Sequence, residues 1–95
     1  MAALEPNSFL FNADDFGMGS HISDGITLAV NQGIVTSVSV CMNGRESAED
    51  IRRRLRNVST AQIGLHINLT EGFPVLLASR LGSLVNEEKR FRRAD

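Results

Sequence analysis

The chain has 95 residues, so it can form one small domain or part of a larger one, since domains typically contain about 100–150 residues. Ten basic and eleven acidic side chains give a formal net charge of −1, which provides no positive field to attract nucleic acid or an anionic membrane. Hydrophobic residues make up 42% of the chain, but no run approaches the ~20 apolar residues of a membrane-spanning helix.

The first predicted strand covers residues 8–11, an apolar run that leads into an acidic pair and two glycines. A helix is predicted over residues 21–32, with Ser20 as its N-cap and Gly33 as its C-terminal stop. Its apolar positions recur at offsets of four, seven and eight, and are therefore expected on one buried face: Ile22, Ile26, Ala29 and Val30.

Strand and helix patterns then repeat. Residues 34–41 are rich in β-branched side chains and predict a second strand, which contains Cys41 as a small buried hydrophobic residue. Residues 46–56 predict a second helix with one apolar side, and residues 62–69 predict a third strand. Two acid-before-base pairs four residues apart are expected on the second helix, Glu49 with Arg53 and Asp50 with Arg54.

This element order predicts an α/β fold built from βαβ units around a parallel sheet. The strands begin near residues 8, 35 and 62, and this spacing of 27 residues, continued to eight units, approaches the ~250 residues of a (β/α)₈ barrel. We therefore expect residues 1–95 to be an N-terminal βαβαβ portion of a TIM-like barrel, incomplete as given. Such a portion leaves a hydrophobic sheet edge open to pairing, including with a second copy of the chain.

Polar side chains follow each predicted strand. Asp14 and Asp15 follow the first strand, Asn43 follows the second, and His66 and Asn68 lie toward the end of the third. The carboxyl ends of parallel strands share one side of a sheet, so we expect these five residues to converge. Adjacent carboxylates and an imidazole from separate strands are suitable ligands for a divalent metal ion.

Other interpretations remain open at this point. Asp14 and Asp15 are also typical of a helix-capping pair in a solvated turn, and His66 of a hydrogen-bonded histidine in a core. Receiver-like domains also place paired aspartates after a first parallel strand, but they require an aspartate at the end of the third strand, where this chain has His66 and Asn68.

Four sequence blocks, in this order, resemble the opening of the YdjC-like carbohydrate deacetylases, a family that includes chito-oligosaccharide deacetylases. The blocks are Asn12-Ala13-Asp14-Asp15-Phe16-Gly17, Gly33-Ile34-Val35-Thr36-Ser37, Met42-Asn43-Gly44 and Gly64-Leu65-His66-Ile67-Asn68-Leu69-Thr70-Glu71-Gly72-Phe73-Pro74. The resemblance spans about residues 8 to 93 and corresponds to the N-terminal portion of the family. It implies a barrel-like α/β fold and removal of N-acetyl groups from amino sugars or chito-oligosaccharides with a divalent metal ion, Mg²⁺ or Zn²⁺.

The resemblance also implies a role for each site residue. Asp14 corresponds to the catalytic base, and Asp15 and His66 correspond to metal ligands, although the two aspartates could exchange roles. Asn43 and Asn68 lie in matching blocks and are expected to bind substrate or to support the ligands through hydrogen bonds.

The chain departs from the family in one respect. The family has a later histidine-rich segment that supplies another metal ligand, and this sequence has no counterpart to it. His21 lies outside the matching blocks and is expected to be a surface or capping residue. A truncated deacetylase, inactive alone, is therefore one hypothesis, and a non-catalytic remnant that binds a sugar or a partner chain is the alternative.

The cellular compartment is predicted from two features. The single cysteine cannot form an internal disulfide, and the N-terminal sequence MAALEPNS lacks the basic start and apolar run of a signal peptide. We therefore expect a cytoplasmic protein whose partner is an N-acetylated sugar.

Overall fold

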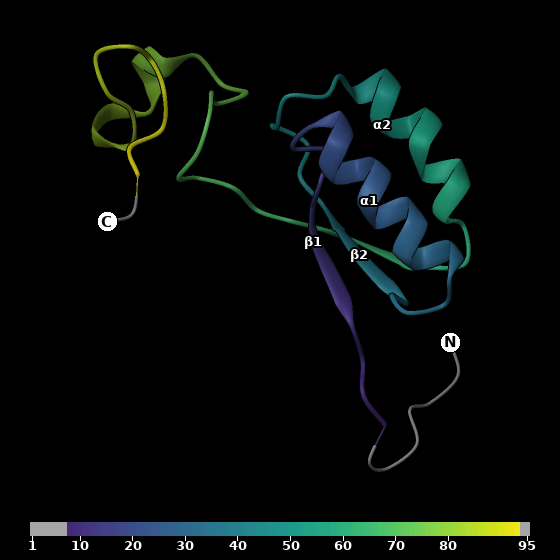
Figure 1. Cartoon of the computed structure of the whole chain (residues 1–95). Helices are drawn as coiled ribbons and strands as arrows, with labels where there is room; N and C mark the ends of the chain where they lie inside the picture. Colours follow the sequence, from purple (N-terminus) through teal and green to yellow (C-terminus); the bar gives the residue numbers. More distant parts are fainter. Residues whose placement is uncertain (1–7, 94–95) are drawn as a thin grey trace.

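The computed structural model describes residues 8–93, which contain a parallel three-stranded sheet. The main elements are β1 (Asn12–Phe16), α1 (Ser20–Asn31), β2 (Ser37–Val40), α2 (Ala48–Leu55) and β3 (Gln62–Leu65). Strands β1 and β3 pair with the two edges of β2, and both pairings are parallel. Helices α1 and α2 lie side by side across one face of the sheet (Figure 1). The predicted α/β class and βαβαβ order are confirmed.

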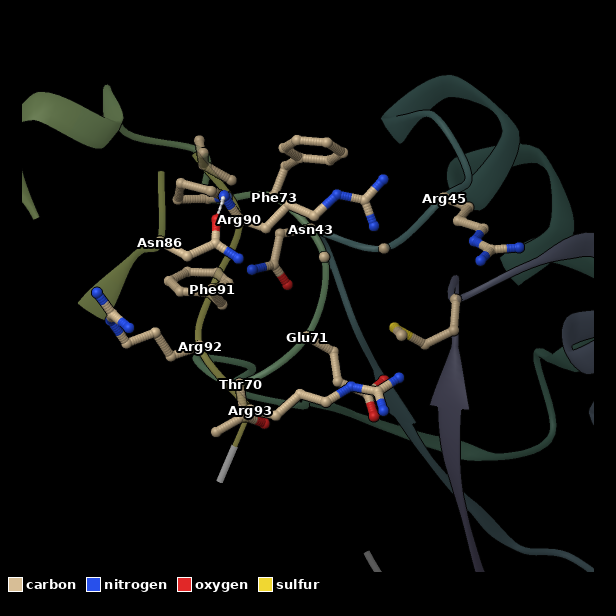
Figure 2. Close-up of a pocket in the computed structure, with 15 residues that line it drawn as sticks. Asn43, Arg45, Thr70, Glu71, Phe73, Asn86, Arg90, Phe91, Arg92 and Arg93 are labelled. Carbon is tan, nitrogen blue, oxygen red and sulfur yellow. Dashed lines mark hydrogen bonds between the residues drawn. The ribbon is translucent and has the colours of Figure 1, made fainter. Parts of the chain in front are cut away.

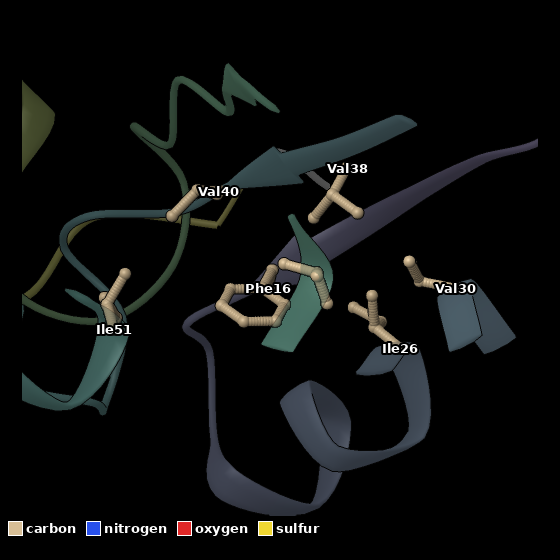
Figure 3. Packing of buried hydrophobic residues seen from close by; sticks show 7 residues of the cluster. Phe16, Ile26, Val30, Val38, Val40 and Ile51 are labelled. Carbon is tan, nitrogen blue, oxygen red and sulfur yellow. The ribbon is translucent and has the colours of Figure 1, made fainter. Parts of the chain in front are cut away.

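The core lies between this face and the two helices. Phe16, at the end of β1, is fully buried and lies among side chains from α1, β2 and α2 (Figure 3). The core cluster consists of Phe16, Ile26, Val30, Val38, Val40, Ile51 and Val58. Because Val38 and Val40 face the helices, the alternating Ser37 and Ser39 face the opposite side of the sheet.

The position of the first strand was predicted wrongly. The apolar residues Phe9, Leu10 and Phe11 are exposed, and the strand that pairs with β2 begins at Asn12 and includes both aspartates. Ala13 and Phe16 both pack on the core side although they are three residues apart, because the strand register shifts between them. An apolar run thus marked the vicinity of the strand but not its register.

Both helices are found within two residues of their predicted limits, with differences in detail. The N-cap of α1 is Gly19 rather than Ser20, and Ile22 is exposed, whereas Ser23 occupies the buried face. In α2, Ser47 is the N-cap, and its hydroxyl accepts a hydrogen bond from the backbone N–H of Asp50. Gly33 ends α1 with a φ of 79°, as predicted from its freedom to adopt left-handed backbone.

The predicted ion pairs of the second helix are also different. Arg53 pairs with Asp50, three residues earlier, rather than with Glu49. Arg54, also on α2, pairs with residues outside this helix, namely Asp24 of α1 and Glu46 of the β2–α2 loop. The two pairs four residues apart are therefore not formed: Arg53 pairs three residues back within α2, and Arg54 pairs with residues outside the helix.

The chain beyond β3 forms a separate folded segment. It contains short 3₁₀ helices at Ala78–Arg80 and Gly82–Leu84 and an antiparallel bridge between Val85 and Phe91. In Figure 1 this segment lies to one side of the sheet. The described strands form an open sheet, so membership of a barrel stays a prediction. None of the helices within residues 8–93 has the length and apolar character needed to cross a bilayer.

Candidate functional site

The two aspartates lie on an irregularity in the sheet. Ala13 is opposite Val38 and Phe16 is opposite Val40, so β1 has one residue more than β2 between these two pairs. This is a β-bulge, a feature that redirects side chains and often occurs beside active sites. Asp15 has a φ of 74°, in the left-handed region that few residues other than glycine, asparagine and aspartate adopt.

The bulge brings Asp15 next to His66. The Oδ1 atom of Asp15 lies 3.3 Å from Nδ1 of His66, although the two residues come from opposite edges of the sheet. His66 directly follows β3, and its backbone N–H donates to the Val40 carbonyl at 2.8 Å, which extends the ladder with β2. The predicted proximity of these two side chains is confirmed.

Asp14 takes a different position. Its Oδ1 accepts a hydrogen bond of 2.8 Å from the side-chain amide of Asn12, which also contacts Ser37 and Ser39 on β2. Within residues 8–93, no three His, Cys, Asp or Glu side chains form a group that could hold a metal ion. Asp14 therefore does not join Asp15 and His66 as a third ligand, and the five predicted residues form separate groups.

Asn43 and Asn68 form one of these groups. The Asn43 amide donates to the Asn68 carbonyl at 3.0 Å, and the Asn68 amide contacts Asn43 Oδ1 at 3.3 Å. Asn68 also fixes the loop after His66, because its side chain bonds to backbone atoms of Thr70 and Glu71. The thiol of Cys41, which is buried as predicted, donates to Asn43 Oδ1 at 3.2 Å. These contacts hold the ends of β2 and β3 together.

Sequence reasoning missed a partly buried ionic network beside the turn that follows Asp15. Ser23 is fully buried, and its hydroxyl donates to the carboxylate of Glu46, which also contacts Arg54. A hydrogen bond to Asp24, followed by the charge of Glu46, raises the pKa of the Arg54 guanidinium, while burial opposes this shift. A serine among the apolar positions of α1 was the available signal for this network.

A groove adjoins Asn43 and the loop that follows His66. Its volume is about 890 Å³, within the range of small-molecule sites. Figure 2 shows Asn43 between Phe73 and Glu71, with the guanidinium of Arg90 near the Phe73 ring, and the distance from that guanidinium carbon to the ring centroid is 4.6 Å. Arg45, Arg92 and Arg93 also line the groove, which the sequence analysis did not identify.

Asp15 and His66 fit a divalent cation by their chemistry and spacing. Nδ1 of His66 is buried and makes no hydrogen bond, a costly condition that a cation shared with the carboxylate would relieve. Two ligands of one tetrahedral ion, each about 2.1 Å from it, lie about 3.4 Å apart. The separation of 3.3 Å between Oδ1 and Nδ1 is close to that value.

Comparison with known proteins identifies the family. The family model for YdjC-like proteins matches residues 8–95, almost the whole chain. The chain belongs to the YdjC-like family. Among similar proteins, a carbohydrate deacetylase of Oceanobacillus iheyensis is 36% identical over 81 residues, and a human carbohydrate deacetylase is 45% identical over 82 residues.

A solved structure with the same arrangement supports this membership. It is a cellobiose-phosphate cleavage protein of Enterococcus faecalis V583, with a TM-score of 0.80 and 31% identity over 90% of this chain. The YdjC-like chain described here covers 33% of that structure, 34% of the Oceanobacillus protein and 24% of the human protein. The alignment covers 85% of this chain for the Oceanobacillus protein and 83% for the human protein. It therefore spans about a third or less of each relative.

Proposed function

We propose that this chain supplies the N-terminal part of a metal-dependent carbohydrate deacetylase site that removes N-acetyl groups from amino sugars. The observation that carries the proposal is the contact between Asp15 and His66, with the Nδ1 atom of His66 buried and without a hydrogen bond. The family membership and the relatives named carbohydrate deacetylase support the reaction class.

The residues divide the work as follows. Asp15 and His66 would hold Zn²⁺ or Mg²⁺, and a bound ion would supply Lewis-acid polarisation of the acetyl carbonyl. Asp14 acts as general base, since its exposed carboxylate can accept a proton from water. The amide of Asn12 orients that carboxylate through its 2.8 Å hydrogen bond. Asn43 and Asn68 position the loop that follows His66, and the adjoining groove receives the sugar.

A titration of the purified chain with Co²⁺ tests the metal site, because bound cobalt is visible by its absorption. We expect Asp15→Ala and His66→Ala to abolish the binding, because each removes one of only two protein ligands. Asp14→Ala is the matched control: it removes the neighbouring carboxylate and should leave cobalt affinity within about twofold. Loss of binding in Asp14→Ala alone would reverse the roles of the two aspartates, and absence of binding to the unaltered chain would refute the metal site.

A second candidate is sugar binding without hydrolysis, favoured by the presence of two ligands rather than three within residues 8–93. Acetate release from N-acetylated chito-oligosaccharides separates the two. The deacetylase proposal expects release that Asp14→Ala reduces by at least about 100-fold, the usual contribution of a general base. Sugar binding with cobalt bound and no acetate released would be the result expected for the second candidate and for a deacetylase segment that is inactive alone.

A further inference from the structure

Ser23 and Glu46 bind the backbone N–H and carbonyl groups of Gly17. Its N–H donates to the hydroxyl of Ser23 at 3.0 Å, and its carbonyl accepts from the N–H of Glu46 at 3.1 Å. Gly17 lies two residues after Asp15, in the turn that closes when the Met18 N–H donates to the Asp15 carbonyl at 3.0 Å. Both peptide groups of Gly17 are therefore tied to Ser23 and Glu46.

The side chain of Glu46 connects these bonds to the helices. It is only 7% exposed, and its two oxygens face different partners, the Ser23 hydroxyl and the Arg54 guanidinium, whose Nε lies 2.5 Å from Oε1. Arg54 also reaches Asp24 on α1. A buried carboxylate persists only when it is paired and hydrogen-bonded. Residues of α1 and α2 therefore hold Glu46 in place together, and Glu46 holds the turn that contains Gly17.

The turn has little room to move. A Cβ atom on Gly17 would lie 2.5 Å from the Cys41 carbonyl, and one on Gly44 would lie 2.5 Å from the Gly17 carbonyl. Backbone in the left-handed region, as at Asp15, persists when the surrounding structure constrains it from several directions. The constraint on Asp15 comes from this packing and from the Ser23 and Glu46 hydrogen bonds.

We propose that Ser23 and Glu46 are positioning residues for the candidate site: through Gly17 they hold the Asp15 turn so that its carboxylate contacts His66. This inference rests on the proposed function only for its chemical consequence, which is metal affinity. The alignment of Asp15 with His66 can be measured with or without a metal ion.

The first experiment follows the ring resonances of His66 by NMR at one fixed pH. In an otherwise unaltered chain, the substitution Asp15→Asn should shift the His66 ring resonances, because the Asp15 carboxylate lies 3.3 Å from Nδ1 of His66. In a Ser23→Ala background the same substitution should shift them by less than half as much. Glu46→Gln should give a smaller reduction, because its NH₂ group replaces one of the two oxygens that face Ser23 and Arg54 and cannot accept a hydrogen bond. If Ser23→Ala does not fold, Glu46→Gln alone decides.

Asp24→Asn is the matched control, because it alters a contact of the same Arg54 but has no hydrogen bond to Gly17. It should leave the effect of Asp15→Asn unchanged. Cobalt affinity should fall about tenfold or more in Ser23→Ala and stay within about twofold in Asp24→Asn. If Asp15→Asn shifts the His66 resonances as much in Ser23→Ala and Glu46→Gln as in the otherwise unaltered chain, the positioning role is overturned. If the NMR result is as expected but cobalt does not bind, only the metal site is overturned.

Discussion

At the scale of single residues, Asp15 combines an unusual backbone with the central side-chain contact. Its φ of 74° follows from the bulge in β1, and the same bulge turns its carboxylate toward His66. Aspartate tolerates this conformation better than most residues because its short side chain can bond locally. The turn then continues through Gly17, whose φ of 96° suits the third residue of a tight turn.

We expect Gly17→Ala to lower the free energy of unfolding by about 1–3 kcal/mol, because the new Cβ meets the Cys41 carbonyl at a positive φ. Gly25→Ala is the matched control. Gly25 lies inside α1 with no atom within 4 Å of its added Cβ, so alanine should stabilise the chain by about 0.5–1 kcal/mol. Urea unfolding measures the free energy of unfolding of both variants. Equal effects would show that the chain accommodates the close approach of the new Cβ to the Cys41 carbonyl without loss of stability.

The proximity of Asp15 and His66 was predictable, because the ends of parallel strands meet at one side of a sheet. The separation of Asp14 from that pair was not, since it depends on a bulge whose register emerges only when β1 pairs with β2. The roles of Ser23 and Glu46 were also hidden. Ser23 among the apolar positions of α1 was a signal for one partner, but its contact with Glu46 joins positions 23 residues apart, and no local pattern in the sequence encodes that pairing.

At the scale of elements, β3 differs from the other two strands. Helices α1 and α2 leave it uncovered, and Ile63 and Leu65 are 48% and 68% exposed although they neighbour the buried Val38 and Val40. Ile67 continues this apolar row beyond the strand and is 73% exposed. Unpaired backbone and apolar side chains at one edge are a template for pairing with another chain. Within residues 8–93 no further strand pairs with β3, which agrees with the open edge predicted from the element count.

We expect the chain to self-associate through this edge and Leu65→Lys to suppress that association, because a charged residue on an edge strand opposes edge-to-edge pairing. Sedimentation velocity at increasing protein concentration measures it. Leu28→Lys provides the control, since Leu28 is 59% exposed on α1, away from the edge. Both substitutions should change the unfolding free energy by less than about 0.5 kcal/mol. A monomer at every concentration, or equal effects of both variants, would rule out the edge as the contact.

At the scale of the molecule, the chain contains two packed regions. The core cluster joins the sheet to α1, α2 and the 3₁₀ turn at Arg56–Val58, whereas Val85 and Phe91 are buried in the C-terminal segment and are not part of that cluster. The elongated extents of 47 × 29 × 21 Å agree with this division. The alternating strand and helix order was predictable from periodicity. The C-terminal segment was only partly predictable, because its 3₁₀ turns are formed by backbone hydrogen bonds and do not show a repeat of apolar residues.

Because the regions have separate cores, we expect them to open separately. Phe91→Ala removes a side chain that is 6% exposed and should increase hydrogen exchange at the amides of Asn86, Phe91 and Arg92, which bond within the C-terminal segment or to Gly72. Exchange at the amides of Cys41 and His66, which bond to neighbouring strands, should stay unchanged.

Val38→Ala is the complementary change within the sheet core. Val38 is 1% exposed, and its truncation should lower the free energy of unfolding by roughly 2 kcal/mol and increase exchange at the amides of Cys41 and His66. Exchange measured by NMR at residue resolution distinguishes the two variants. If Phe91→Ala accelerates exchange in the sheet as much as in the C-terminal segment, the two regions unfold as one cooperative unit, and the groove between Asn43 and Arg90 is then as stable as the sheet that carries Asp15 and His66.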